Sequence, residues 1–292
     1  MCQRLEVSPR RACQVLSPPR GTQRYPSRRV DLDKALVAAM KRLSRTHPRY
    51  GYRRITALLR VEGWCVHRKR VYRLWRQEGL KVPTKTRKRQ RLGGSQNRCT
   101  RRRAEHINHV WSYDFVADQT EDGRRLKMLV VLDEYTRESL SIDVARRIQA
   151  QDVIATLEYL FAVRGAPEYL RSDNGPEFVA EAIQQWLKNS GVSTLYIAPG
   201  RPWENAYIES FNSRFEDELL KAESFANLRK AKVLVEEYRL RYNHQRPHSS
   251  LRYTTPAAFA AACLASAPAS AGPAPTPNRE EVAVNSLIRA GT

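Results

Sequence analysis

Three acidic residues have the types and positions that metal-dependent phosphoryl chemistry requires. Asp114 lies within an aromatic and apolar segment, Asp173 directly precedes a turn sequence, and Glu209 lies in a helical pattern. A charge in a central strand costs free energy unless it is paired or binds a metal. Carboxylates suit Mg²⁺ and Mn²⁺, and two ions about 3.5–4 Å apart stabilise both the attacking and the leaving oxygen of a phosphoryl displacement. The three acids therefore predict a site for two Mg²⁺ or Mn²⁺ ions.

Each acid also has an ordinary explanation when it is considered alone. Asp114 is then a strand-edge acid on the solvent face, and Asp173 begins an Asx turn that ends at Gly175. Glu209 is then a surface acid on an amphipathic helix. Their joint occurrence favours the metal site.

The elements around the acids predict an α/β core. Apolar alternation and turn residues indicate strands, and apolar residues three and four apart indicate helices. The predicted strands cover residues 110–118, 126–135, 139–147, 167–173 and 192–199, and the predicted helices cover 150–165, 180–191, 205–220 and 227–242. Three antiparallel strands followed by alternating helices and strands predict a mixed five-stranded sheet with helices on both faces.

The charge of +21 is concentrated ahead of this core. Residues 1–100 have a net charge of +22 and residues 101–292 a net charge of −1. Such a segment attracts a polyanion, because each neutralised phosphate releases counterions. Helical patterns over 31–45, 50–63 and 68–79 predict a small all-α helix-turn-helix domain.

The last of these helices has two contrasting faces. Val71, Leu74 and Trp75 form the apolar face, and a basic face opposite them is a candidate DNA contact. The basic residues are Lys69, Arg73 and Arg76. A helical hairpin with a solvated basic face is the alternative.

A very basic segment follows. Residues 81–103 contain ten Lys or Arg and no acid, which predicts a flexible linker whose Arg87, Lys88 and Arg89 track phosphates. Alanine, proline and serine dominate the end of the chain, which predicts a disordered tail. The expected domains are a DNA-binding region at 1–80, the linker at 81–105, the catalytic core at 106–262 and the tail at 263–292.

Three runs around the acids resemble the Asp-Asp-Glu core of insertion-sequence transposases, relatives of retroviral integrases. They are WSYDFV, YLRSDNGPEF and PGRPWENAYIESFNSRFEDELL, and they are separated as in that family, with 58 residues between the first two acids and 35 between the last two. The segment NHQRPHSSLRYTTPAAF resembles the family's ending, and RYGYRRITALLR resembles the helix-turn-helix that precedes its core.

The resemblance implies a ribonuclease-H-like fold, with Asp114, Asp173 and Glu209 as catalytic metal ligands. It implies DNA cleavage and strand transfer at the ends of an insertion sequence, through a circular intermediate. More narrowly, the chain resembles a second-reading-frame product that works as a frameshift fusion with the first-frame product. The expected DNA partners are then the terminal repeats and the target DNA, and the protein is expected to form a homo-oligomer on DNA. The rival functions are a hydrolytic nuclease on the same fold and a non-catalytic DNA-binding regulator.

Residues that flank the acids are further candidates for DNA contact. Asn174 orients Asp173 or DNA, or only shapes the turn; Trp203 stacks on a base or packs in the core. Arg201 and Tyr207 lie where substrate DNA should pass. Arg246 and His248 fit a phosphate contact and a structural hydrogen bond equally well.

Other function classes find little support. No run of about 18 apolar residues predicts a membrane span, and neither a signal peptide nor a paired cysteine motif is evident, so we expect a bacterial cytoplasmic, nucleoid-associated protein. Cys99, His106 and His109 have the spacing nearest to that of metal ligands, but they lack a fourth partner, so no zinc site is predicted.

Overall fold

The computed structural model describes residues 8–17, 21, 30–83, 103–172, 181–196 and 205–266. The chain divides into two compact units, Met1–Gly93 and Gly94–Thr292, each of which is described by itself. Most of the predicted linker at 81–105 lies outside the described residues, as do residues 267–292 of the predicted tail. None of the helices in the described ranges is both long and apolar enough to cross a bilayer.

The first unit has a small helical core. It contains α1 (Pro9–Leu16), α3 (Val30–Thr46), α4 (Tyr52–Val61) and α5 (Arg68–Gln77), and the last three match the predicted helices. Gly63 and Gly79 follow α4 and α5 with φ of 87° and 63°, a left-handed conformation that glycine adopts without a Cβ penalty. The buried residues of this core are Leu36, Met40, Leu43, Tyr50, Ile55, Leu59, Val66, Val71, Leu74 and Trp75.

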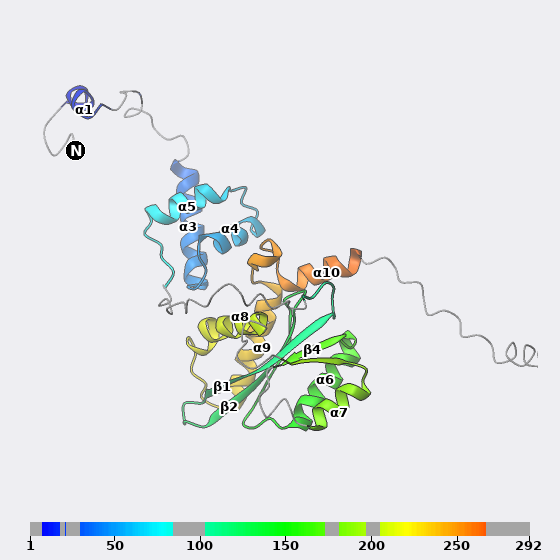
Figure 1. Ribbon diagram of the computed structural model, residues 1–292. Helices are drawn as coiled ribbons and strands as arrows, with labels where there is room; N and C mark the ends of the chain where they lie inside the picture. Colours follow the sequence, from blue (N-terminus) through cyan, green and yellow to red (C-terminus); the bar gives the residue numbers. More distant parts are fainter. Residues whose placement is uncertain are drawn as a thin grey trace, which may run out of the picture. The chain divides into compact units, whose positions relative to one another are not determined.

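The second unit is built on the predicted mixed five-stranded sheet. Its order is β3-β2-β1-β4-β5, with β1, β2 and β3 antiparallel and β1, β4 and β5 parallel (Figure 1). The strands are β1 (Val110–Gln119), β2 (Arg125–Asp133), β3 (Ser139–Ala145), β4 (Tyr169–Ser172) and β5 (Ser193–Tyr196). β1 is central, and it is the strand that contains Asp114.

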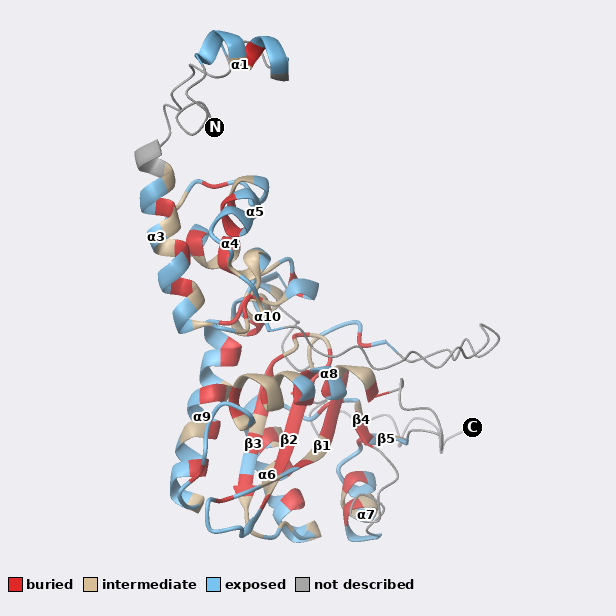
Figure 2. Cartoon of the chain, turned by 90° about the vertical axis from the view of Figure 1, so that its left-hand side faces the viewer, coloured by how far each residue is buried: buried red, intermediate tan, exposed pale blue. Residues whose placement is uncertain are grey.

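Helices cover both faces of this sheet. One face packs on α6 (Ala150–Arg164) and α7 (Glu181–Asn189), and the other on α8 (Ala206–Phe215) and α9 (Leu228–His244). Successive side chains of β1 point to opposite faces of the sheet. Tyr113 therefore packs in the core under α6 and α7, and Val116 packs in the core under α8 and α9. The buried residues therefore follow the strands and the helix faces turned towards them (Figure 2).

Two segments differ from the expected helices. The helix predicted over 205–220 is α-helical to Phe215 and then forms a π-helix, η2 (Glu216–Leu220). An additional helix, α10 (Pro256–Ser266), runs past residue 262, where the core was expected to end. Alanine has the highest helix propensity and Pro256 occupies the first turn, where proline is tolerated, so this alanine-rich segment forms a helix despite its tail-like composition.

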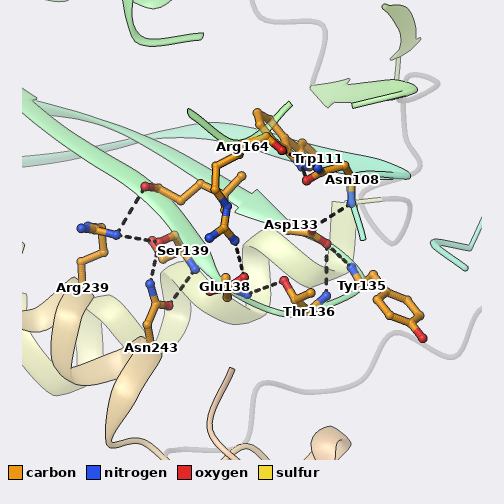
Figure 3. A network of polar contacts seen from close by, with 11 residues as sticks. Asn108, Trp111, Asp133, Tyr135, Thr136, Glu138, Ser139, Arg164, Arg239 and Asn243 are labelled. Atoms are coloured by element: carbon orange, nitrogen blue, oxygen red, sulfur yellow. Dashed lines mark hydrogen bonds and ion pairs between the residues drawn. The ribbon is translucent and has the colours of Figure 1, made fainter. Parts of the chain in front are cut away.

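A polar network joins the ends of β1, β2 and β3 to α6 and α9 (Figure 3). The fully buried Asp133 accepts hydrogen bonds from the backbone N–H groups of Tyr135 at 2.7 Å, Thr136 at 3.1 Å and Asn108 at 3.1 Å. Burial raises the pKa of the Asp133 carboxyl, and these donors oppose the rise. Asn243 on α9 makes two bonds of 2.9 Å to the backbone of Ser139. The network fixes the segment that leads into β1.

Replacing Asp133 tests this anchor. Asp133→Ala removes the acceptor of three backbone N–H groups, so we expect the free energy of unfolding of the second unit to fall by about 3 kcal/mol. Urea denaturation of the full chain measures it, and Glu223→Ala, at an exposed position, is the control. Equal stability of the two variants would show that the anchor contributes little.

Candidate active site at the junction of β1 and α8

Asp114 is held between its own strand and a helix. Its side chain is half-buried in β1. Oδ1 accepts a hydrogen bond of 2.8 Å from the backbone N–H of Phe115. Oδ2 accepts a hydrogen bond of 2.8 Å from Nδ2 of Asn212 on α8. The carboxylate therefore has a fixed orientation at the place where α8 contacts the sheet.

Glu209 lies one helical turn before Asn212 on α8. Residues three and four apart share a helix face, so Asn205, Glu209 and Asn212 lie along one side of this helix. Glu209 is exposed, whereas Asn205 and Asn212 are 4% and 8% exposed. The hydrogen bond from Asn212 to Asp114 places this side of α8 at β1.

Asp173 itself lies outside the described residues, but the strand before it is well defined. β4 pairs in parallel with β1. The first pair is Val110 and Tyr169, and the last pair is Ser112 and Arg171. Asp114 and Asp173 each follow that last pair by two residues of sequence.

A buried ion pair fixes β4 at this point. Arg171 Nε lies 3.0 Å from Glu134 Oε1, and Ser112 donates its hydroxyl to the same oxygen. Arg171 is 4% exposed and Glu134 is 1% exposed. Sequence analysis missed this pair, because a buried Arg and Glu look like surface residues until their partners are known.

The side-chain oxygen atoms at the junction of β1 and α8 are of the type that binds a hard cation. Asp114 and Glu209 supply carboxylates, and the Oδ1 atoms of Asn205 and Asn212 are buried without a hydrogen-bond partner within the described part of the chain. Buried amide oxygens normally have a donor or a cation beside them. Carboxylate and amide oxygens are the ligands of Mg²⁺ and related ions. The residues present therefore fit the predicted ions.

The predicted basic face of α5 is exposed. Lys69, Arg73 and Arg76 are exposed, and Val71, Leu74 and Trp75 are buried on the other side. Asp33 on α3 pairs with Arg73 at 3.1 Å and with Arg70 at 2.7 Å. Arg73 is thereby oriented in part by its own unit.

Most other predicted DNA contacts lie outside the described residues. They are Arg87, Lys88, Arg89, Asn174, Arg201 and Trp203. Tyr207 is half-buried on α8, with the guanidinium carbon of Arg137 3.5 Å from the centre of its ring.

The structure decides between the alternatives for Arg246. It is 2% exposed, and Nη2 and Nε donate to Glu218 of η2 at 2.6 and 2.9 Å. This bidentate pair joins the segment after α9 to the end of α8, so the role of Arg246 is structural. The ring of His248 packs edge-on against Tyr242, and Ser250 Oγ lies 2.9 Å from Nδ1 of His248.

A basic groove at one end of the sheet was not predicted. It is formed by the end of β1, the start of β2 and the segment between β3 and α6, and Phe115, the neighbour of Asp114, lines it. Among the described residues, Asp118 is the one acid that lines it. The basic lining residues are Arg124, Arg125, Lys127, Arg146 and Arg147. They come from two short basic groups about twenty residues apart in the sequence, and only the fold shows that these groups line one groove.

Comparison with known proteins defines the family. Two models of an integrase core domain match residues 104–202 and 190–256, and a model of a helix-turn-helix-like domain matches 31–89. A 31.7 kDa protein of insertion element IS407 from Burkholderia multivorans is 39% identical over 92% of this chain and 96% of its own length. The transposase InsD of an Escherichia coli IS2 element is 30% identical over 72% of each chain. The chain belongs to the insertion-sequence transposases with an integrase core. The predicted fold class, family and general activity, DNA cleavage and strand transfer, are thereby confirmed.

Among solved structures, a chain of the simian T-cell lymphotropic virus intasome shares 16% identity with this transposase. The TM-score is 0.49, over 82% of this chain and 79% of that one.

Asn212 is expected to be a positioning residue for Asp114. Asn212→Ala removes the donor to Oδ2, so we expect DNA cleavage to slow by about 10- to 100-fold through misplacement of the carboxylate. The free energy of unfolding should fall by only about 1–2 kcal/mol. Single-turnover cleavage and urea denaturation separate the two effects. Ser210→Ala, at an exposed position of α8, is the control, and an unchanged cleavage rate in Asn212→Ala would remove Asn212 from the site.

Proposed function

We propose that Asp114, Asp173 and Glu209 form the catalytic site of this transposase and hold two Mg²⁺ or Mn²⁺ ions. The observation that carries the proposal is the hydrogen bond from Asn212 to Asp114, because Asn212 follows Glu209 by one turn of α8 and Asp114 belongs to β1. The parallel pairing of β1 and β4 supports the inclusion of Asp173. The ions, when bound, supply charge stabilisation to the attacking and leaving oxygens of the phosphodiester.

The chemistry needs no covalent protein intermediate. Water attacks a phosphodiester at an end of the element, the P–O bond to the 3′ oxygen breaks, and a 3′-OH remains. That hydroxyl then attacks a second phosphodiester, so one P–O bond forms as another breaks and the strands join. Asp114, held by Asn212 and the Phe115 N–H, fixes the geometry for both steps. Family resemblance supports attack near the opposite end of the element and a circular intermediate.

DNA binding is divided between the two units in this proposal. The terminal repeat is contacted by the basic face of α5, which consists of Lys69, Arg73 and Arg76. Phosphates are contacted by the basic segment that contains Arg87, Lys88 and Arg89. The DNA strand at the acids is guided by four residues of the core, Asn174, Arg201, Trp203 and Tyr207. The expected partner is the first-reading-frame product, joined by frameshifting, and two DNA ends require an oligomer. The protein would then work at the bacterial nucleoid.

The catalytic test uses labelled element-end DNA and the full chain, alone and fused to its upstream frame. Asp114→Asn and Glu209→Gln each remove a charged ligand, so we expect both nicking and strand joining to fall by at least about 1,000-fold. Activity should require Mg²⁺ or Mn²⁺. Glu181→Gln, at an exposed position of α7, is the control for a lost acidic charge.

The outcomes separate the rival functions. Cutting that ignores the terminal sequence and never joins strands would identify a hydrolytic nuclease. Binding of the end DNA with no strand chemistry, even in the fusion, would identify a regulator.

The basic groove gives a second test of DNA contact by the core. Arg125→Glu with Arg147→Glu reverses two exposed charges of the groove. If each arginine neutralises one phosphate, the slope of log affinity against log salt should become shallower by about 1.8. Lys188→Glu with Arg229→Glu makes the same charge change at exposed positions elsewhere in this unit. Equal slopes for the two double variants would mean that DNA does not enter the groove.

A further inference from the structure

Two histidines and a glutamate meet where β1 and β4 begin. His106 and His109 precede β1, and Glu168 precedes β4. The backbone joins these segments, because the N–H of Glu168 donates to Asn108 and the N–H of Tyr169 donates to His109, each at 3.0 Å. The cluster is therefore at the starts of the same two parallel strands that lead to Asp114 and Asp173, and it shares no residue with the catalytic proposal.

The two imidazole rings are stacked, with centroids 4.6 Å apart, and the Nε2 atom of each lies near the Glu168 carboxylate. His106 Nε2 lies 3.1 Å from Glu168 Oε1, and His109 Nε2 lies 3.7 Å from Glu168 Oε2. One such atom from each of the three residues lies within 4.8 Å of the others. Ligands about 2.0–2.1 Å from a tetrahedral ion are about 3.3 Å apart, so binding one ion requires these atoms to approach by up to about 1.5 Å and one ring to turn out of the stack.

The contacts of His106 suit a metal ion bound at Nε2. Its Nδ1 lies 3.0 Å from the carbonyl oxygen of Ile107, while Nε2 faces the Glu168 carboxylate. With an ion on Nε2, the ring would carry its N–H on Nδ1, where the Ile107 carbonyl accepts it, as is usual for histidine ligands.

The surrounding structure holds the histidine segment in place. Asn108 has a left-handed φ of 59°, which asparagine tolerates better than most residues. Its N–H donates to Asp133, its Nδ2 donates to the carbonyl of Arg164 at 2.7 Å, and its Oδ1 accepts Nε1 of Trp111 at 3.1 Å (Figure 3). The side chain of His109 is 7% exposed. The position of the turn is thus fixed by contacts outside the cluster.

We propose that His106, His109 and Glu168 form a second metal site, for a divalent transition ion of the Zn²⁺ class. Both histidines would bind through Nε2, Glu168 through its carboxylate, and water would occupy the fourth position, which is open because Glu168 is 54% exposed. Two imidazoles favour Zn²⁺ over Mg²⁺, which prefers oxygen ligands.

Metal binding should change the tautomer of His109. In the structure Nδ1 of His109 accepts the N–H of Glu105 at 3.0 Å, which places the ring proton on Nε2. Coordination through Nε2 moves that proton to Nδ1 and releases the Glu105 N–H to another acceptor. The bound ion would clamp the starts of β1 and β4 together and fix the chain where the core begins.

The test is metal binding by the untagged full chain in excess Mg²⁺, which occupies the carboxylate site. Zn²⁺ is titrated against a chromogenic chelator, and thermal unfolding is followed with and without Zn²⁺. We expect one Zn²⁺ equivalent and a higher Tm in the wild type. His106→Gln and Glu168→Gln should each weaken this binding at least about 100-fold, since each removes a direct ligand. His244→Gln, at an exposed position of α9, is the matched control and should bind like the wild type.

Two results would overturn the proposal. One is Zn²⁺ binding of equal strength in His106→Gln, Glu168→Gln and the wild type, which would place the ion elsewhere. The other is no Zn²⁺ binding by the wild type in excess Mg²⁺. Both replaced side chains are more than half exposed, so the variants should fold, and their circular dichroism spectra verify this.

Discussion

The buried pair of Arg171 and Glu134 constrains how β4 lies in the sheet of the second unit. Burying two charges costs several kcal/mol per ion before their attraction is counted, and leaving one alone is worse. The pair is therefore satisfied only when β4 lies beside β1 in one register, with Ser112 completing the arrangement. A register slip would separate the charges. Such a pair fixes the position of β4 and adds little net stability.

The register of β1 and β4 determines which residues lie together at each end of this strand pair. In one direction the chain proceeds from the last paired residues towards Asp114 and Asp173. In the other direction it leads back to the histidine and glutamate cluster. The polar network around Asp133 fixes the segment before β1 independently, because its donors come from Asn108, Tyr135 and Thr136. The geometry at the acids thus depends on contacts that are buried and distant from solvent.

The far side of the site depends on α8 and its continuation. Ile208, Phe211 and Phe215 bury one face of α8 on the sheet, and Glu209, on the side that carries Asn212, keeps an exposed side chain. The π-helical turn after Phe215 changes the direction of the side chains, and it brings Glu218 to Arg246. The chain after α9 is thereby fixed to the helix that presents Glu209.

Much of this arrangement could be predicted from sequence, and the failures have physical reasons. The periodic patterns of α3, α4, α5 and the three antiparallel strands reflect burial of one face, which is a local signal. The role of Arg246 and the partnership of Glu168 with His106 depend on residues brought together by the fold, so no spacing shows them.

Segments with weak local signals were also misjudged. α10 was missed because alanine serves equally in helices and in low-complexity tails, and only packing against the rest of the unit separates the two. The π-helix has the same apolar pattern as an α-helix over so few residues, so the sequence cannot distinguish them.

The distribution of charge explains why the proposed site needs cations. DNA phosphates and the carboxylates of Asp114 and Glu209 repel each other, and the chain from residue 101 onward has a net charge of −1. The long-range attraction comes from residues 1–100, whose charge of +22 concentrates DNA near the protein without bringing a phosphodiester to the acids. Local positive charge must therefore offset the repulsion at the acids themselves. In the proposed function, the basic groove beside Phe115 would supply part of it along the strand end, and divalent ions would supply the rest where the bonds change.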